Sequence, residues 1–395
     1  MNDARVRVGM IGAGFQARAH ARAYKRVVEP RVEIVAVSAA HKATAEGMAD
    51  EHGIAAAYDD YRQVLARADV DVVDLCVPNH LHEPIAVAAA AAGKHVICEK
   101  PLTGYFGGPG AAEPVGATPK RLMLEAALAS ADRMQAAARS AGVQLMYAEN
   151  WLYMPAVQKA LRLIEASGGT VLEMRAGECH SGSHAAYAKT WRTSGGGALL
   201  RLGAHPIGGV VFLKWQEGLR RQGAPIRVQA VTAEVGDLTR VPSFQAERER
   251  WVGTGWEDVE NWGTMVLTFA DGARATVFAA DTTLGGIDNR LEVYLSNGLI
   301  KCDMAHSTLL QAYAPSPQVF AGEYLAEKLE TKAGWSYPSV DEEFLLGFPQ
   351  ELQDFAAAVA HNRSPLATAD FARDVVRAIY AGYVSAEEGR RVVLG

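Results

Sequence analysis

The first segment whose residue types and spacing could do chemistry is a glycine-rich turn near the N-terminus. It fits the pattern G-x-G-x-x-G/A and reads Gly12, Ala13, Gly14, Phe15, Gln16, Ala17. The first glycine of such a turn allows a sharp bend, and the second lets the backbone approach a pyrophosphate. The segment follows an apolar strand predicted over 6–11, and we expect a helix to begin near Arg18. The pattern therefore predicts a dinucleotide held at a helix N-terminus, where backbone amides attract negative charge.

The end of the second predicted strand bears on the choice of nucleotide. A strand over 32–37 leads to Ser38, where a chain that binds NAD usually carries an acid for the ribose hydroxyls. Ser38, His41 and Lys42 could instead hold a 2'-phosphate, although Lys42 could equally be a solvated helix residue. The sequence leaves NAD and NADP open as cofactors, with a slight lean to NADP.

Two further side chains could exchange protons with a substrate. Lys100 stands between Glu99 and Pro101 at the end of a strand predicted over 95–98, in the crevice where doubly wound sheets bind ligands. Its ammonium could hydrogen-bond a developing alkoxide, or it could be a surface lysine paired with Glu99. His205 follows a glycine-rich turn and could serve as an acid or base near neutral pH, or it could be a core histidine with satisfied hydrogen bonds.

The elements that must position these residues alternate between strand and helix in the first third of the chain. Strands are predicted over 6–11, 32–37, 70–77, 95–98 and 143–148, with helices over 42–52, 84–93 and 121–140 between them. This alternation is typical of βαβ units and a parallel sheet, so the fold class is α/β with an N-terminal Rossmann domain over 1–149. A glycine- and proline-rich loop over 103–120 interrupts the domain.

The pattern changes after Glu149, and we expect a second domain over 150–395. Longer alternating strands are predicted over 262–269, 273–278 and 291–294, with the turn signals Asp271-Gly272 and Asn297-Gly298 between them. They favour an antiparallel sheet. A final segment over 348–388 is predicted to be helical, with a break at Ser364-Pro365.

Composition narrows the classes of function. The 395 residues carry a formal net charge of −6, which offers no positive field for nucleic acid. We also expect no membrane contact, because no apolar stretch reaches the ~18 residues that would span a bilayer. The N-terminus shows no signal-peptide core, so a cytoplasmic location is expected. The four cysteines lie far apart and are interpreted as reduced core thiols.

Several motifs taken together resemble the glucose-fructose oxidoreductase and inositol dehydrogenase (Gfo/Idh/MocA) family. The motifs run through most of the chain: Cys76-Val77-Pro78-Asn79-His80-Leu81-His82-Glu83-Pro84, Glu99-Lys100-Pro101, Trp191-Arg192, Gly195-Gly196-Gly197, Leu202-Gly203-Ala204-His205-Pro206 and Ser385-Ala386-Glu387-Glu388-Gly389. The resemblance implies a second domain of α+β type with a large open, mainly antiparallel sheet that mediates homodimers or homotetramers. It also implies that Lys100 and His205 are catalytic beside a nicotinamide, and that Pro78, Asn79, His82, Glu99, Trp191 and Arg192 line the cofactor site.

One departure from the family pattern is Arg201, which stands four residues before His205 where the family typically carries an aspartate. Arg201 could clamp an acidic group such as a uronate or sulfonate, or it could turn away and pair with a structural acid. The family also implies that Asn150 and Tyr153 line the substrate pocket, although aromatic residues at a domain junction are also common core residues.

A second departure is the segment from Glu178 to His184. Glu178 and His180 would share a face of a strand, and with His184 and His205 they could gather a divalent metal. We expect no metal and interpret His180 and His184 as polar residues that bind sugar hydroxyls. The loop over 103–120 could be a lid, with Tyr105 or Phe106 stacking on a sugar, or a subunit contact.

These observations predict an NAD(P)-dependent oxidoreductase acting on a carbinol or carbonyl carbon of a sugar, sugar acid or polyol. One alternative is a glycosidase that oxidises its sugar only transiently, with no net redox change. Another is a noncatalytic subunit that senses nucleotides.

Overall fold

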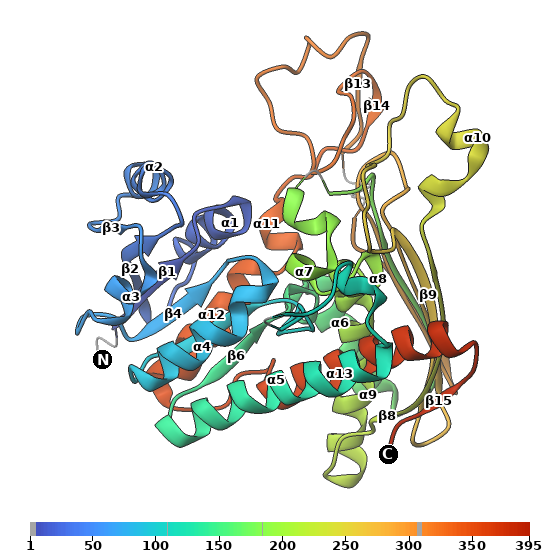
Figure 1. Cartoon of the computed structure of the whole chain (residues 1–395), viewed down its shortest axis with the longest axis horizontal. Coiled ribbons are helices and arrows are strands. Elements are labelled where there is room, and N and C mark those ends of the chain that lie inside the picture. The colour runs from blue at the N-terminus through green and yellow to red at the C-terminus, as the bar shows by residue number, and fades with distance from the viewer. Residues whose placement is uncertain (1–4, 109, 184, 306–309) are drawn as a thin grey trace. The chain divides into compact units, whose positions relative to one another are not determined.

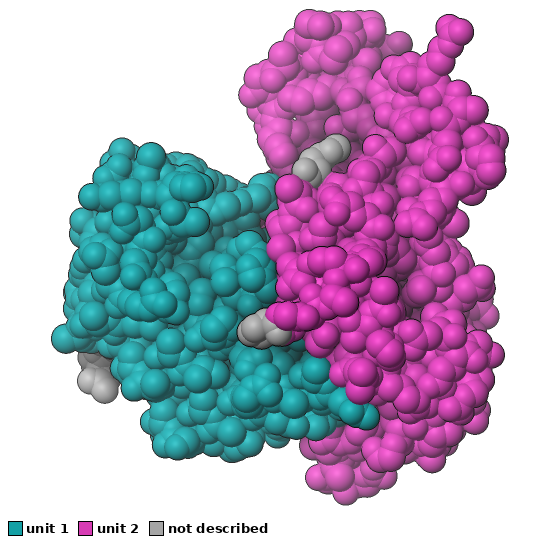
Figure 2. Space-filling view, viewed as in Figure 1, with its two compact units in different colours: residues 1–104, 125–153, 347–376 teal, residues 105–124, 154–346, 377–395 magenta. Residues whose placement is uncertain are grey.

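The computed structural model describes residues 5–108, 110–183, 185–305 and 310–395, which form two compact units (Figure 2). Unit 1 comprises Met1–Gly104, Glu125–Tyr153 and Gly347–Val376, and unit 2 comprises Tyr105–Leu124, Met154–Leu346 and Arg377–Gly395. The division differs from a single boundary after Glu149. The loop predicted as an insertion groups with unit 2, and a late helical segment returns to unit 1.

Unit 1 is built on a parallel six-stranded sheet in the order β3-β2-β1-β4-β5-β6 (Figure 1). Its strands are β1 (Arg5–Ile11), β2 (Arg31–Ser38), β3 (Ala57–Tyr58), β4 (Val72–Leu75), β5 (His95–Glu99) and β6 (Leu145–Ala148). All described pairings in this sheet are parallel. The order reverses between β1 and β4, which is where a doubly wound sheet binds a dinucleotide. The Rossmann prediction is confirmed.

The helices of unit 1 follow the predicted alternation. They are α1 (Phe15–Tyr24), α2 (Lys42–His52), α3 (Tyr61–Leu65), η1 (Asn79–Leu81), α4 (His82–Ala91), α5 (Lys120–Ala141), η3 (Asn150–Tyr153), α12 (Phe348–His361) and α13 (Ala369–Glu388). Helices α5 and α13 each run across the division between the units. Helix α1 begins at Phe15 rather than near Arg18, because the extended backbone of Gly14 already serves as its N-cap. Helix α12 packs against α1 and β1 and so becomes part of the Rossmann core.

Unit 2 contains a seven-stranded sheet in the order β12-β11-β7-β10-β9-β8-β15. The strands are β7 (Val171–Cys179), β8 (Val228–Gly236), β9 (Trp262–Phe269), β10 (Arg274–Ala280), β11 (Asp288–Leu295), β12 (Gly298–Asp303) and β15 (Val392–Val393). The pairings are antiparallel except for that of β7 with β10. Residues of β10 alternate between exposed and buried, so one face is covered, with α8 and α9 against it. The mainly antiparallel sheet is confirmed.

The other elements of unit 2 are short apart from two helices. They are η2 (Val115–Ala117), α6 (Pro155–Ser167), η4 (Ala186–Lys189), α7 (Trp191–Ser194), α8 (Ala198–Arg201), α9 (Ala204–Gln222), η5 (Leu238–Arg240), α10 (Pro242–Gln245), β13 (Ala312–Ala314), β14 (Gly334–Ser336) and α11 (Glu342–Leu345). Within the described ranges, no single helix is both long and apolar enough to cross a bilayer. One pair bent by 55°, Trp191–Arg201 with Ala204–Gln222, meets that length and composition test.

Candidate functional site

The glycine turn of unit 1 has the geometry that a pyrophosphate requires. Gly12 has φ +112°, and a Cβ there would lie 2.1 Å from the carbonyl oxygen of Cys76, so only glycine fits. A Cβ built on Gly14 would meet no described atom within 4 Å. Ala17 is fully buried against the sheet, whereas Phe15 is 64% exposed. The turn therefore fits a dinucleotide, whose pyrophosphate would lie over Gly14 and the first amides of α1.

Ser38 and Lys42, the residues proposed to contact the ribose, do not form a preorganised site for a 2'-phosphate. Ser38 is 2% exposed, and its buried hydroxyl oxygen has no hydrogen-bond partner among the described residues. The Lys42 side chain is 61% exposed, and its Nζ lies 3.9 Å from Glu46 one turn further along α2. The interpretation of Lys42 as a solvated helix residue agrees with this geometry.

Lys100 follows β5 and is held by two backbone contacts. Its amide donates a hydrogen bond to Oε2 of Glu99 at 2.9 Å. The next residue, Pro101, has its carbonyl oxygen 2.9 Å from Nδ1 of His82, whose Nε2 lies 3.0 Å from the carbonyl oxygen of Val77. Burial lowers the pKa of His82, so the imidazole is neutral and donates one of these two bonds. His82, proposed to bind cofactor, is thus placed as a brace between the loops after β4 and β5.

Glu99 is itself held by a buried chain of charged groups. The Nε2 atom of His20 lies 3.1 Å from Oε1 of Glu99, and its Nδ1 lies 2.9 Å from Oδ2 of Asp74. Burial alone would lower the pKa of His20, but the electrostatic and hydrogen-bond interactions with Asp74 and Cys76 outweigh it, and the pKa is raised well above its usual value. The imidazolium therefore links β4 to the Glu99 carboxylate, and through it to the Lys100 backbone. The sequence analysis missed this chain.

A further carboxyl group faces the same cluster from α12. Glu351 is fully buried, and both of its carboxyl oxygens lack a hydrogen-bond partner within the described part of the chain. Burial raises its pKa well above the usual carboxyl range, although the charge of His20 acts in the opposite direction. The environment of Glu351 therefore favours the uncharged form of its carboxyl group.

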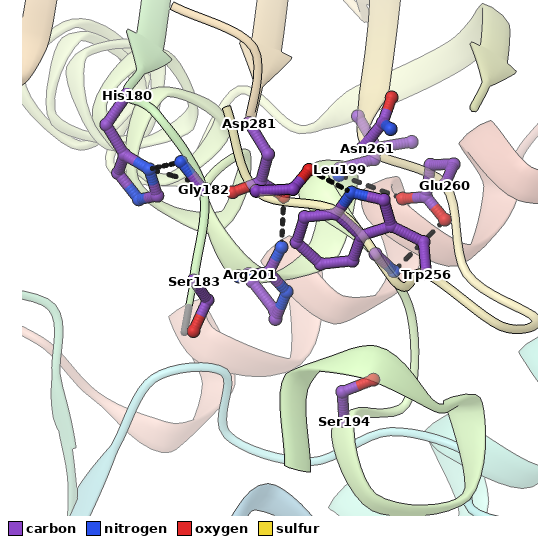
Figure 3. A network of polar contacts seen from close by, with 12 residues as sticks. His180, Gly182, Ser183, Ser194, Leu199, Arg201, Trp256, Glu260, Asn261 and Asp281 are labelled. Atoms are coloured by element: carbon purple, nitrogen blue, oxygen red, sulfur yellow. Dashed lines mark hydrogen bonds and ion pairs between the residues drawn. The ribbon is translucent and has the colours of Figure 1, made fainter. Parts of the chain in front are cut away.

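His205 lies in the first turn of α9 and is 7% exposed. The glycine-rich turn before it is fixed by Glu260, whose carboxylate accepts hydrogen bonds from the amides of Gly197 at 3.0 Å and Leu199 at 2.9 Å (Figure 3). The hydroxyl of Tyr383 donates a third bond to Glu260 at 2.7 Å. Three hydrogen bonds to Glu260 therefore hold together the turn that leads to His205 and the helix residue Tyr383, although Glu260 was not among the predicted residues.

Arg201 pairs with a buried acid, one of the two alternatives left open by the sequence. Its guanidinium donates a hydrogen bond to Oδ2 of Asp281, which follows β10 and is fully buried (Figure 3). Its Cζ also lies 5.1 Å from the ring centroid of Trp256. Burial raises the pKa of Asp281, while Arg201 acts to lower it. Sequence reasoning did not find Asp281 or Trp256.

The proposed metal candidates are placed as follows. The Nδ1 atom of His180 accepts a hydrogen bond from the amide of Gly182 at 2.9 Å and lies 3.6 Å from Oδ1 of Asp281. Glu178 is 6% exposed on β7, and His184 lies outside the described residues. Within the described residues, the potential ligands that lie within 4.8 Å of one another are His20, Asp74 and Cys76. The 2.9 Å contact between His20 and Asp74 is a hydrogen bond.

Other residues proposed for the pocket are largely engaged within their own unit. The hydroxyl of Tyr153 donates to Asp354 at 2.8 Å and accepts from the amide of Ala367 at 3.2 Å, so it serves the core of unit 1. Trp191 is 3% exposed, and its ring centroid lies 4.9 Å from that of Tyr383. Of the remaining candidates, Asn79 and Asn150 are buried, and Pro78 precedes η1. Gln16 is half-buried, and its side-chain amide nitrogen lies 3.1 Å from Nε2 of His20.

The loop over 103–120 is bound to unit 2 at several points. Glu113 pairs with Arg192 at 2.5 Å, and the amide of Gly116 donates to Asp258 at 2.8 Å. The amide of Tyr105 donates to the hydroxyl of Tyr380 at 2.7 Å. These contacts favour a fixed segment over a mobile lid.

Comparisons with known proteins agree with this architecture. The family model described as an oxidoreductase family with an NAD-binding Rossmann fold matches residues 6–149, and the GFO/IDH/MocA C-terminal domain matches residues 157–301. D-xylose 1-dehydrogenase (NADP(+)) 2 of Haloferax volcanii is 25% identical over 92% of both chains. Levoglucosan dehydrogenase of Pseudarthrobacter phenanthrenivorans is 43% identical over 101 residues, which cover only 26% of that protein. The solved structure of GenD2 from gentamicin A biosynthesis, in complex with NAD, has a TM-score of 0.81 and 26% identity, and the match covers 99% of this chain and 97% of that one.

The Rossmann sheet and its glycine turn define an NAD-binding oxidoreductase. The chain belongs to the GFO/IDH/MocA family, with both the N-terminal and the C-terminal domain of that family present.

Proposed function

We propose that this chain is an NAD(P)-dependent dehydrogenase that exchanges a hydride with a carbinol or carbonyl carbon of a sugar, sugar acid or polyol. The relatives that match it include proteins named as D-xylose, D-glucoside and inositol dehydrogenases. The match to the D-xylose enzyme extends over nearly the whole of both chains, so both domains are held in common.

The observation that carries the proposal is the support of Lys100 at the carboxyl edge of the Rossmann sheet. Its amide is tied to Glu99, which is in turn tied to His20 and Asp74. A buried chain of charged groups is costly to fold unless it is fully paired. Here the chain of charged groups fixes the segment that carries Lys100. This favours Lys100 as a positioned catalytic residue over a surface lysine.

We propose that two side chains, those of Lys100 and His205, carry the proton chemistry of the reaction. During oxidation the Lys100 ammonium donates a hydrogen bond to the carbinol oxygen as that oxygen gains negative charge. The His205 imidazole accepts the hydroxyl proton, and a carbon–oxygen double bond forms as the carbon loses its hydride. When bound, the nicotinamide supplies the chemistry of accepting or returning that hydride. Gly12, Gly14 and the first turn of α1 would hold its pyrophosphate.

For the cofactor, we propose NAD(H) as the main nucleotide, with NADP(H) tolerated because no acid ends β2. GenD2 and levoglucosan dehydrogenase have been solved with NAD or NADH, whereas the Haloferax relative is named as an NADP(+) enzyme. The Lys42 side chain is mostly exposed to solvent, which favours only a weak contribution of its charge to binding a 2'-phosphate.

We also propose that the chain forms a homodimer or homotetramer through the sheet of unit 2. Leu172, Val266 and Phe278 on its strands are 53%, 41% and 37% exposed, and an oligomer formed through this sheet would cover such apolar side chains. Sedimentation velocity would show a single species of monomer mass if this proposal is wrong.

The test of the reaction is a panel of sugars, polyols and aryl glycosides, each with NAD⁺ and NADP⁺. A dehydrogenase produces reduced nicotinamide in proportion to the substrate consumed, followed by its absorbance. Lys100→Met should lower kcat by roughly 10²- to 10⁴-fold while nucleotide binding persists. Release of the aryl group without net reduced cofactor would establish the glycosidase alternative, and nucleotide binding with no turnover of any compound would favour the sensing subunit.

A further inference from the structure

A cluster of charged side chains gathers around Trp256 in unit 2. The indole is 7% exposed and its Nε1 donates a hydrogen bond to the carbonyl oxygen of Gly253 at 3.0 Å, so the ring is fixed. The Nζ of Lys189 lies 3.5 Å from the ring centroid, and the Cζ of Arg201 lies 5.1 Å from it. Two cations therefore share one aromatic ring.

A third cation reaches the same place from a distant segment. The Nζ of Lys328 donates to the carbonyl oxygen of Gly182 at 3.3 Å. The turn at Gly182 is joined to the Trp256 loop, because the amide of Gly253 donates to the carbonyl oxygen of Ser181 at 2.6 Å. The Gly182 amide also donates to His180. Figure 3 shows His180, Gly182, Arg201 and Asp281 close together, with Trp256 beside them.

Several cations of this cluster gather around one described acid, Asp281. Asp281 is fully buried, and Arg201, Lys189 and Lys328 are the described charged groups that act on it most strongly. Arg201 already forms an ion pair with that carboxylate. The positive charges of Lys189 and Lys328 are therefore not matched by it. Burial and the neighbouring Arg201 lower the pKa of Lys189, as expected where cations are crowded.

We propose that Lys189 and Lys328, backed by Arg201, form a subsite for an anionic group of the substrate, so that acidic sugars are preferred to neutral ones. The inference rests on the proposed function and names the substrate class for it. An anion would relieve the crowding of like charges, and partial burial would strengthen its attraction to the ammonium groups. Arg201 acts through its pair with Asp281, as a positioning residue that holds the Trp256 side of the cluster.

A carboxylate is the group that the cluster suits best. Two ammonium groups are point-like donors that can each approach one oxygen of a carboxylate. A phosphate ester has the same chemistry with more charge. The panel must therefore contain both kinds of anion.

The test is calorimetric titration of the 395-residue chain with NADH bound. The panel consists of D-glucuronate, D-galacturonate, D-gluconate and D-glucose 6-phosphate, each compared with neutral D-glucose and D-galactose. At least one acidic compound should bind about tenfold or more tightly than its neutral counterpart, as expected for hydrogen bonds to charged groups. Lys189→Gln and Lys328→Gln should each remove about tenfold of that affinity and leave neutral sugars unaffected. Lys159→Gln, at an exposed position on α6, is the matched control.

Acidic compounds that bind no better than neutral ones, or not at all, would overturn the inference, as would a preference untouched by either variant. Turnover of the same panel separates it from the proposed function. Oxidation of neutral sugars without any preference for acidic ones would refute the subsite and leave the proposed dehydrogenase function intact. Selective acidic binding without any oxidation would keep the subsite and refute the dehydrogenase.

Discussion

Removal of Arg201 from its buried pair should be strongly destabilising. The Arg201 side chain is 9% exposed and that of Asp281 is fully buried. Breaking such a pair by removing one partner costs ~3–5 kcal/mol, because a buried charge loses its counterion. Lys189 and Lys328 also act on Asp281, so we expect Arg201→Met to cost about 3 kcal/mol. In a unit of this size, that corresponds to a melting temperature lower by roughly 6–12 °C.

The destabilisation caused by Arg201→Met should depend on pH, and the pKa of Asp281 determines the direction of that dependence. The pKa of Asp281 is raised by burial, and loss of Arg201 raises it further. A carboxyl whose folded pKa exceeds its unfolded pKa loses stability as pH rises through the interval between them. The thermal destabilisation by Arg201→Met should therefore be larger near about pH 8 than near about pH 5.

Arg201→Met with Asp281→Leu is the matched control for this pair. The double variant removes both charges and should recover most of the lost melting temperature. A single variant within about 2 °C of the native chain, or a double variant no more stable than the single one, would refute the buried pair.

Three further predictions concern unit 1. Glu351→Gln should be more stable than the native chain by an amount that grows with pH, up to about 1.4 kcal/mol per pH unit. The reason is that the pKa of Glu351 is raised in the folded state, so the native chain loses stability as the pH rises from the ordinary carboxyl pKa toward that raised pKa. Parallel pH profiles of the unfolding free energy would contradict this. His20→Asn should lower kcat roughly tenfold with a much smaller effect on the Kd for NADH, since it releases Glu99, whereas at the glycine turn it removes only a side-chain contact with Gln16; equal losses in both would indicate a merely structural role. Ser38→Asp should lower kcat/KM with NADP⁺ by roughly tenfold or more without a comparable loss with NAD⁺, because the new carboxylate repels a 2'-phosphate; an unchanged ratio between the cofactors would place the nucleotide elsewhere.

Local patterns in the sequence predicted most of the regular elements. Helix α2 and strand β9 have the predicted bounds, because each shows a clear period and is followed by a turn signal. The break between α12 and α13 was also predicted from Ser364-Pro365. The parallel pairing of β7 with β10 was beyond such reasoning, since about 100 residues separate the paired positions and no local pattern records the register.

The site residues divide in the same way. Gly12 and Lys100 are found from motifs, because their roles depend on the backbone immediately around them. Asp281 was missed because its partner Arg201 lies 80 residues earlier. One signal was available for Asp74, a carboxylate in the middle of the otherwise apolar strand Val72–Leu75, which must find a buried partner.

The most direct test of the proposed reaction is the fate of one hydrogen atom. Sugars deuterated on every carbon, both neutral and acidic, are incubated with the native chain and either NAD⁺ or NADP⁺, and the nucleotide and the sugar are then analysed by mass spectrometry. We predict one deuterium on the nicotinamide for every carbonyl formed, and transfer that is slower by roughly 10²-fold or more with Lys100→Met. Carbonyl formation without deuterium on the nucleotide, or no transfer from any sugar with either cofactor, would contradict hydride exchange at this site.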